Sequence, residues 1–169
     1  MSIEKKIGKL LIKKNLTLSI AESCTGGLLS HMITNMPKSS AYFDSSVVCY
    51  AANAKVGLLG LSEKIISRYG TVSIETAMAM AKAVKRLRNT KIGLAVTGIA
   101  GPGSIEKKPV GTVYIAVSYG NKIYAEGFRF KGNRKEIKTK AASAAMRLLW
   151  KHIYPVRKPG GGFSNGVKA

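Results

Sequence analysis

AESCTGGLLS, residues 21–30, connects a short run of strand-forming residues to a turn with two glycines and then to an apolar segment. A strand that ends in a glycine-rich turn and leads into a helix is a building unit of α/β sheets. A hydroxyl in such a turn lies among unpaired backbone N–H groups, near the positive end of the helix dipole. Ser23 is therefore a candidate attacking oxygen, although a helix N-cap at Ser23 or Thr25 explains the same spacing.

Strands alternate with helices on both sides of this stretch. Strands are expected at residues 16–21, 45–51 and 91–98, and two more flank the hairpin dipeptide Gly120-Asn121. Helices are expected at residues 3–14, from the glycine pair to 35, and at 51–60, 62–68, 74–88 and 134–153. This order predicts an α/β fold, a three-layer α/β/α arrangement around a mixed β-sheet.

The length and composition are typical of one globular domain. With 169 residues and 46% hydrophobic content, the chain can form one core, which we expect over residues 1–153. Residues 154–169 are expected to form a disordered, basic, glycine-rich tail. The sequence contains no apolar run of membrane-spanning length, and its start lacks the features of a signal peptide, so we expect a cytoplasmic protein without membrane contact.

The charge balance is strongly basic, with 28 Lys and Arg against 8 Asp and Glu, a formal net charge of +20. Such a field attracts polyanions and anionic metabolites alike, so a basic module that binds nucleic acid or another partner is the alternative function. However, the basic residues are scattered along the sequence, and no RNA motif with interleaved aromatics accompanies them. A lysine-rich solvated surface explains the composition equally well.

Few residues are available for acid–base chemistry, because the chain has only two histidines and one aspartate. His31 follows Ser23 by eight residues, about 12 Å along a helix, which is too far for it to act as the base of that serine. A Ser-His-Asp triad and a carboxylate-rich magnesium or zinc site are therefore not expected. No cofactor is expected either. A lysine, a tyrosine or Glu22 remains as the base, and Cys24 remains as a rival nucleophile because a helix start favours thiolate.

A second glycine-rich loop follows the buried strand at residues 91–98, with the sequence IAGPGSIEKKPVG. Ligand-binding loops in α/β sheets gather at the carboxyl ends of the strands. The turn after Ala21 and the loop after Val96 are therefore expected to converge on one site, and this convergence favours a site over a simple cap.

Five segments in the same order resemble one known family. They are AESCTGG, VVCYAANAK, VTGIAGPG, KPVGTV and FKGNRKEIK. Together they are similar to the CinA C-terminal domain over about residues 5–152, and the stand-alone members of this family are nicotinamide-nucleotide amidohydrolases. The segment after Cys49 departs from the family pattern, because Tyr50-Ala51-Ala52 stands where Tyr-Ser-Asn is usual.

The resemblance implies a metal-independent Ser/Lys amidohydrolase that converts nicotinamide mononucleotide to nicotinate mononucleotide and ammonia. By motif, Ser23 is the nucleophile and Lys55 the general base, while Tyr50 orients this pair or lines the pocket. Lysine needs a lowered pKa for this role, which burial or nearby positive charge supplies. Backbone N–H groups of a glycine loop would hold the oxyanion.

The resemblance also implies a set of substrate-binding residues. They are Thr25, Gly26, Gly27, Ser46, Thr97, Gly98, Gly101 and Arg134. Arg134 is the expected partner of the substrate phosphate, because its planar guanidinium suits phosphate. By analogy with the family, a homodimer is expected.

Overall fold

The computed structural model describes residues 1–154, and the tail expected beyond them lies outside the described residues. The elements are α1 (Ile3–Lys13), β1 (Leu18–Glu22), α2 (Leu28–Thr34), the 3-10 turn η1 (Ser39–Ala41), β2 (Phe43–Val48), α3 (Ala52–Leu59), α4 (Glu63–Tyr69), α5 (Ile74–Arg88), β3 (Ile92–Gly98), β4 (Thr112–Tyr119), β5 (Lys122–Arg129) and α6 (Arg134–Ile153). The predicted order of helices and strands is confirmed.

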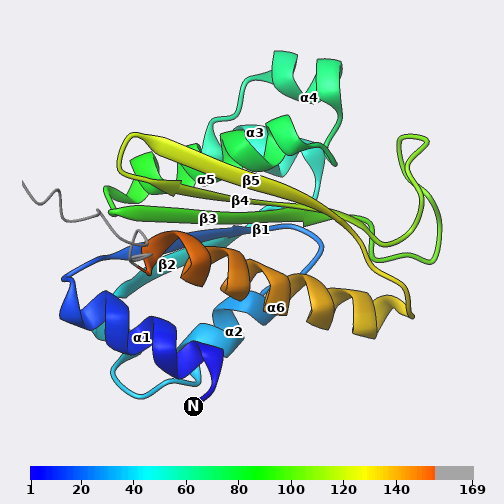
Figure 1. Cartoon of the computed structure of the whole chain (residues 1–169). Coiled ribbons are helices and arrows are strands. Elements are labelled where there is room, and N and C mark those ends of the chain that lie inside the picture. Colours follow the sequence, from blue (N-terminus) through cyan, green and yellow to red (C-terminus); the bar gives the residue numbers. More distant parts are fainter. Residues whose placement is uncertain (155–169) are drawn as a thin grey trace, which may run out of the picture.

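The strands form one five-stranded sheet in the order β2-β1-β3-β4-β5 (Figure 1). β1 lies parallel to both β2 and β3, whereas β4 and β5 are antiparallel to their neighbours. The sheet is therefore mixed, as predicted, and the two-residue turn at Gly120 joins β4 to β5, with Tyr119 opposite Lys122. The carboxyl ends of β1, β2 and β3 lie at one edge of the sheet, where the turns after them meet.

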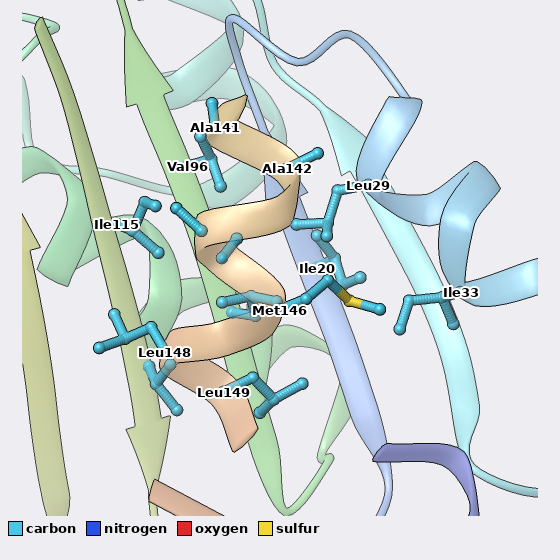
Figure 2. Packing of buried hydrophobic residues seen from close by; sticks show 14 of the residues in the cluster. Ile20, Leu29, Ile33, Val96, Ile115, Ala141, Ala142, Met146, Leu148 and Leu149 are labelled. Atoms are coloured by element: carbon cyan, nitrogen blue, oxygen red, sulfur yellow. The ribbon is translucent and has the colours of Figure 1, made fainter. Parts of the chain in front are cut away.

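Helices cover both faces of the sheet, which gives the predicted three layers. α1, α2 and α6 lie on one face, and α3, α4 and α5 lie on the other (Figure 1). Figure 2 shows α6 crossing the first face, with Ala141, Ala142 and Met146 near Ile20 and Val96 of the strands. The apolar side of this helix is buried against the sheet: Ile137, Ala141, Ala145, Leu148 and Leu149.

On the other face, α5 packs closely against β3 at Gly93. A Cβ atom at Gly93 would lie 2.1 Å from the carbonyl oxygen of Ala81 and 2.8 Å from Cβ of Lys85. Any side chain at this position would force the helix away from the sheet. Gly93 therefore sets the distance between α5 and the central strand, and the strand lies buried between two helical layers.

Two strand boundaries differ from the sequence prediction. The first strand begins at Leu18 and includes Glu22, and the second covers Phe43–Val48 rather than residues 45–51. Pairing explains the shift, because Leu18 lies opposite Phe43 and Glu22 opposite Val48. The strand at residues 43–48 thus ends level with the turn that carries Ser23.

Candidate active site

Ser23 occupies the first position after β1 and is held by the neighbouring strand. Its backbone N–H donates to the carbonyl of Val96 at 3.0 Å, and the N–H of Cys49 donates to the carbonyl of Glu22 at 2.9 Å. These bonds extend the pairing of β1 with β3 and β2 beyond the strand ends. The turn therefore has a fixed position at the carboxyl edge of the parallel strands, where ligand sites of α/β sheets lie.

The carboxylate of Glu22, and not a hydroxyl of the turn, satisfies the start of α2. Its Oε2 accepts hydrogen bonds from the N–H groups of Gly27 and Leu29 at 3.0 and 3.2 Å, and its Oε1 accepts from the N–H and the hydroxyl of Ser30, the former at 2.9 Å. Ser46 donates to Oε1 at 3.4 Å. This carboxylate is fully buried, so it supports the turn and is not placed to act as a base.

The expectation of a helix cap at Ser23 or Thr25 is therefore wrong. The N-cap of α2 is Gly27, which has φ 94° and no side-chain hydrogen bond. The amides at the start of α2 already bind a carboxylate, so the unpaired N–H groups expected near Ser23 are not those of the helix start. A carboxylate at the end of the preceding strand that binds the helix amides has no short-range sequence signal. The glycine at the cap position, Gly27, was the only indication that no side chain of the turn caps α2.

Lys55, on the second turn of α3, lies against Ser23 although the two residues are 32 positions apart. Its Nζ is 3.0 Å from Oγ of Ser23, and it donates to the carbonyl oxygens of Cys49 and Tyr50 at 2.9 and 3.0 Å. The lysine is 1% exposed and the serine 6%. The structure thus brings together the two side chains that the resemblance assigned to nucleophile and base.

Burial lowers the pKa of Lys55 below its usual value of 10.5. Removal from water disfavours the charged form of an amine. The thiols of Cys49 and Cys24 and the carboxylate of Glu106 act in the opposite direction but are weaker. A greater fraction of this amine is therefore neutral near neutral pH than for an exposed lysine.

Cys24 is not a thiolate, so its proposed role as a rival nucleophile is not supported. Burial raises the pKa of this thiol to about 12. Its side chain is buried in the core that α6 covers. Burial outweighs the groups that lower the pKa of this thiol, so the thiolate expected at a helix start is not favoured.

Tyr50 and Arg134 form a second contact at the rim of the site. The tyrosine side chain is 59% exposed, and its hydroxyl accepts a hydrogen bond of 2.7 Å from Nη2 of Arg134. Nη1 of the same arginine donates to the carbonyl of Gly101. Arg134 is the first residue of α6, which Asn133 caps through a capping box with Glu136. The guanidinium therefore joins the start of α6 to the segment after β2, at Tyr50, and to the loop after β3, at Gly101.

The end of β3, just before the second glycine-rich loop, serves packing. The hydroxyl of Thr97 donates to the carbonyl of Thr71 at 2.7 Å. A Cβ atom at Gly98 would lie 2.7 Å from Cγ2 of Val113 and 2.8 Å from the carbonyl of Thr112. Thr97 and Gly98 thus contact neighbouring elements, and only Gly101 reaches the rim contact with Arg134.

A cavity of about 660 Å³ lies beside the Ser23 turn, between α2 and the first turns of α6. It is lined by Thr25, Gly26, Gly27, Leu28, His31, Arg134, Lys135, Lys138 and Thr139. Three of the predicted substrate-binding residues of the turn therefore face a cavity, together with Arg134. Ser46 is instead part of the support of the buried carboxylate at the end of β1.

The fold and this site can be compared with known proteins. A family model described as the CinA C-terminal domain matches residues 1–153. The chain belongs to this family. It is similar to a CinA-like protein of Geotalea uraniireducens, with 43% identity over 157 residues that cover 92% of the chain and 37% of that protein. The chain thus spans little more than a third of the length of this curated relative.

Solved structures of CinA superfamily proteins have the same fold. The chain is similar to a competence-damaged protein (CinA) superfamily protein from Klebsiella pneumoniae, with 28% identity, a TM-score of 0.87 and coverage of 89% of this chain and 95% of that one. It is also similar to a competence/damage inducible protein from Agrobacterium tumefaciens, with 34% identity, a TM-score of 0.85 and coverage of 88% and 92%.

Basic residues occur on helices of both layers of this CinA domain. Lysines of α1 and α6 lie on one side of the sheet and those of α5 on the other. Within residues 1–154, no three or more His, Cys, Asp or Glu side chains are grouped to hold a metal ion. No helix in the same part of the chain has the length and apolarity needed to cross a membrane. The distribution of charge does not favour the nucleic-acid alternative.

Proposed function

We propose that this CinA domain is a Ser/Lys amidohydrolase that deamidates nicotinamide mononucleotide. The observation that carries the proposal is the 3.0 Å contact between Nζ of Lys55 and Oγ of Ser23 in a buried setting. A hydroxyl becomes a useful nucleophile when an adjacent base accepts its proton. The lowered pKa of this lysine supports that role.

The hydrogen bonds of Lys55 fit a neutral amine. A neutral amine has two N–H donors and one lone pair, and the carbonyl oxygens of Cys49 and Tyr50 accept the two donors. The lone pair then faces the hydroxyl of Ser23 and accepts its proton. Through its backbone, Tyr50 positions the base.

Acyl transfer follows from this arrangement. Oγ of Ser23 attacks the carboxamide carbon as Lys55 takes the hydroxyl proton, and the lysine then gives that proton to the departing nitrogen, which leaves as ammonia. Water, deprotonated by the same lysine, attacks the resulting ester. Cleavage of the ester returns the proton to Ser23 and releases the carboxylic acid, so one water is consumed for each ammonia formed.

The turn that follows the nucleophile supplies donors for the oxyanion. Among residues 1–154, the backbone N–H groups of Cys24 and Thr25 have no hydrogen-bond acceptor, whereas the next two amides bind the carbonyl of Ser23 and the carboxylate of Glu22. Free amides directly after a nucleophilic serine are the usual components of an oxyanion hole. Loss of one such donor typically raises the barrier by about 3 kcal/mol.

The test is ammonia release from nicotinamide mononucleotide by the wild type, by Ser23→Ala and by Ser67→Ala, an exposed serine of α4. We expect turnover by the wild type and the Ser67 variant and its loss in Ser23→Ala. Robust turnover by Ser23→Ala would overturn the Ser/Lys assignment. No turnover by any of them, together with DNA binding of steep salt dependence, would favour the basic binding module instead.

A further inference from the structure

We propose that the cavity between the Ser23 turn and α6 binds the phosphomonoester of the substrate, and that Lys138 gives the enzyme its preference for a phosphorylated substrate. This inference rests on the proposed amidohydrolase function and names a residue for which the sequence motifs gave no role. It follows from three features of the cavity: the amides that are already used, a half-buried cation without a carboxylate partner, and a buried hydroxyl without a partner.

The start of α2 is not available to an anion. The N–H groups of Gly27, Leu29 and Ser30 bind the carboxylate of Glu22. A second anion at the same amides would have to displace a buried carboxylate. An anionic ligand in this cavity therefore cannot use these three amides.

Arg134 is also largely engaged. Both of its Nη atoms have partners, one in the carbonyl of Gly101 and one in the hydroxyl of Tyr50. A guanidinium with these bonds fixes the start of α6 and the rim of the cavity. These two bonds set the position of the guanidinium, so its first role is positioning.

Lys138 is the cation that lies over the turn. Its Nζ lies 3.5 Å from the position that a Cβ atom at Gly26 would occupy, and both residues line the cavity. The salt bridges formed among residues 1–154 do not include Lys138. A half-buried ammonium without a carboxylate partner strongly attracts an anion.

The hydroxyl of Thr25 provides an independent indication of a ligand. Thr25 is fully buried, lines the cavity, and its Oγ1 has no hydrogen-bond partner among the described residues. Buried hydroxyls in native proteins normally have partners, so an unpaired one next to a cavity indicates a missing ligand atom. A phosphate oxygen accepts a hydrogen bond from this hydroxyl and lies close to the ammonium of Lys138.

This arrangement predicts discrimination between substrates that differ only in phosphorylation. A doubly charged phosphomonoester gains binding affinity from the ammonium and the hydroxyl together. An uncharged ribose hydroxyl gains little binding affinity from an unpaired cation. Nicotinamide mononucleotide is therefore expected to bind much more tightly than nicotinamide riboside, and Lys138 should account for much of the difference.

Calorimetric binding in the Ser23→Ala background tests this without turnover. We compare Lys138→Met with Lys140→Met, which makes the same change two residues further along α6 at a lysine outside the cavity. In Lys138→Met the affinity for the mononucleotide should fall by about tenfold or more, and the affinity for the riboside should stay the same. Lys140→Met should change neither affinity, and Lys138→Arg should restore most of the mononucleotide binding.

Three outcomes would overturn the inference: no mononucleotide binding by the parent, an affinity in Lys138→Met within twofold of the parent, or an equal loss of riboside affinity. Circular dichroism establishes that each variant is folded. Binding that depends on Lys138 in a protein that releases no ammonia would support the phosphate site while rejecting the hydrolase proposal. The two proposals can therefore fail separately.

Discussion

Glu22 and Lys55 are two buried ionisable side chains at the same edge of the sheet, and they have opposite roles. The carboxylate is fully buried and the amine is 1% exposed. All partners of Glu22 are hydrogen-bond donors from β2 or from the start of α2 and its N-cap, so both of its oxygens are engaged. Lys55 has two carbonyl partners and one reactive hydroxyl. Under the proposed function, the partners of a buried ionisable group, more than its burial, distinguish a structural group from a reactive one.

The largest expected effect is on turnover, when the amine is removed. Lys55→Met keeps the length of the side chain but cannot accept the proton of Ser23, so kcat/KM for ammonia release should fall by about 10² to 10⁴-fold. Lys64→Met, at an exposed lysine of α4, should leave kcat/KM unchanged. Because the two site residues act as a unit, adding Ser23→Ala to Lys55→Met should cost little more. Activity of Lys55→Met within tenfold of wild type would show that another group is the base.

Replacing the carboxylate of Glu22 should mainly lower the stability of the protein. Glu22→Gln replaces one acceptor oxygen with an NH₂ group that faces N–H donors, so at least one buried pair at the start of α2 is lost. We expect the free energy of unfolding to fall by about 2 to 4 kcal/mol, measured by urea denaturation.

The matched control for this change is Glu126→Gln, which removes an exposed ion pair with Lys151. Exposed pairs contribute at most about 1 kcal/mol, so this variant should stay near the wild type. An equal loss of stability in both variants would contradict the view that Glu22 is the structural member of the pair.

The sequence predicted the fold well because local signals mark its elements. Ser73 caps α5 directly before the predicted helix at residues 74–88, accepting a hydrogen bond from the N–H of Thr76. The dipeptide at Gly120 forms the hairpin, and the alanine-rich stripe of α6 is buried. Capping residues, turn dipeptides and apolar periodicity act over a few residues, so they can be identified from the chain alone.

The site was less accessible to the same reasoning, because its contacts join distant segments. Ser23 could be singled out from its turn, but Lys55 was found only by its resemblance to a family motif. The role of Glu22 was missed, since its partners on α2 and β2 depend on the tertiary fold. Gly98 was expected to bind substrate, yet its contacts are with Thr112 and Val113 of the next strand. Glycines required for packing and glycines required for binding look the same in a sequence.

The pH dependence of turnover sharpens the comparison further. If Lys55 must be neutral to accept the proton, kcat/KM should rise about tenfold per pH unit below the pKa of this amine and level off above it. Burial lowers that pKa from 10.5, so the midpoint should lie below 10.5. A midpoint at or above 10.5 would show that kcat/KM does not depend on the protonation of Lys55.

Stability should change with pH in the same direction. Between the lowered pKa of folded Lys55 and the usual value of 10.5, the unfolded chain binds more protons than the folded one. The free energy of unfolding of the wild type, relative to Lys55→Met, should therefore increase as pH rises through this window. Urea denaturation of both proteins over the same pH series measures the difference.

The smallest expected effect concerns the helix that carries the amine. Ala51 is the N-cap of α3, has extended backbone angles and makes no side-chain hydrogen bond. Ala51→Ser supplies a hydroxyl for the free N–H groups of the first turn, so it should raise the free energy of unfolding by about 1 kcal/mol. Ala52→Ser makes the same change at the first helical residue, where the hydroxyl cannot cap the helix. This variant should lower the free energy of unfolding slightly. Equal effects of the two changes would mean that the start of α3 is held by its packing against α5 rather than by its cap.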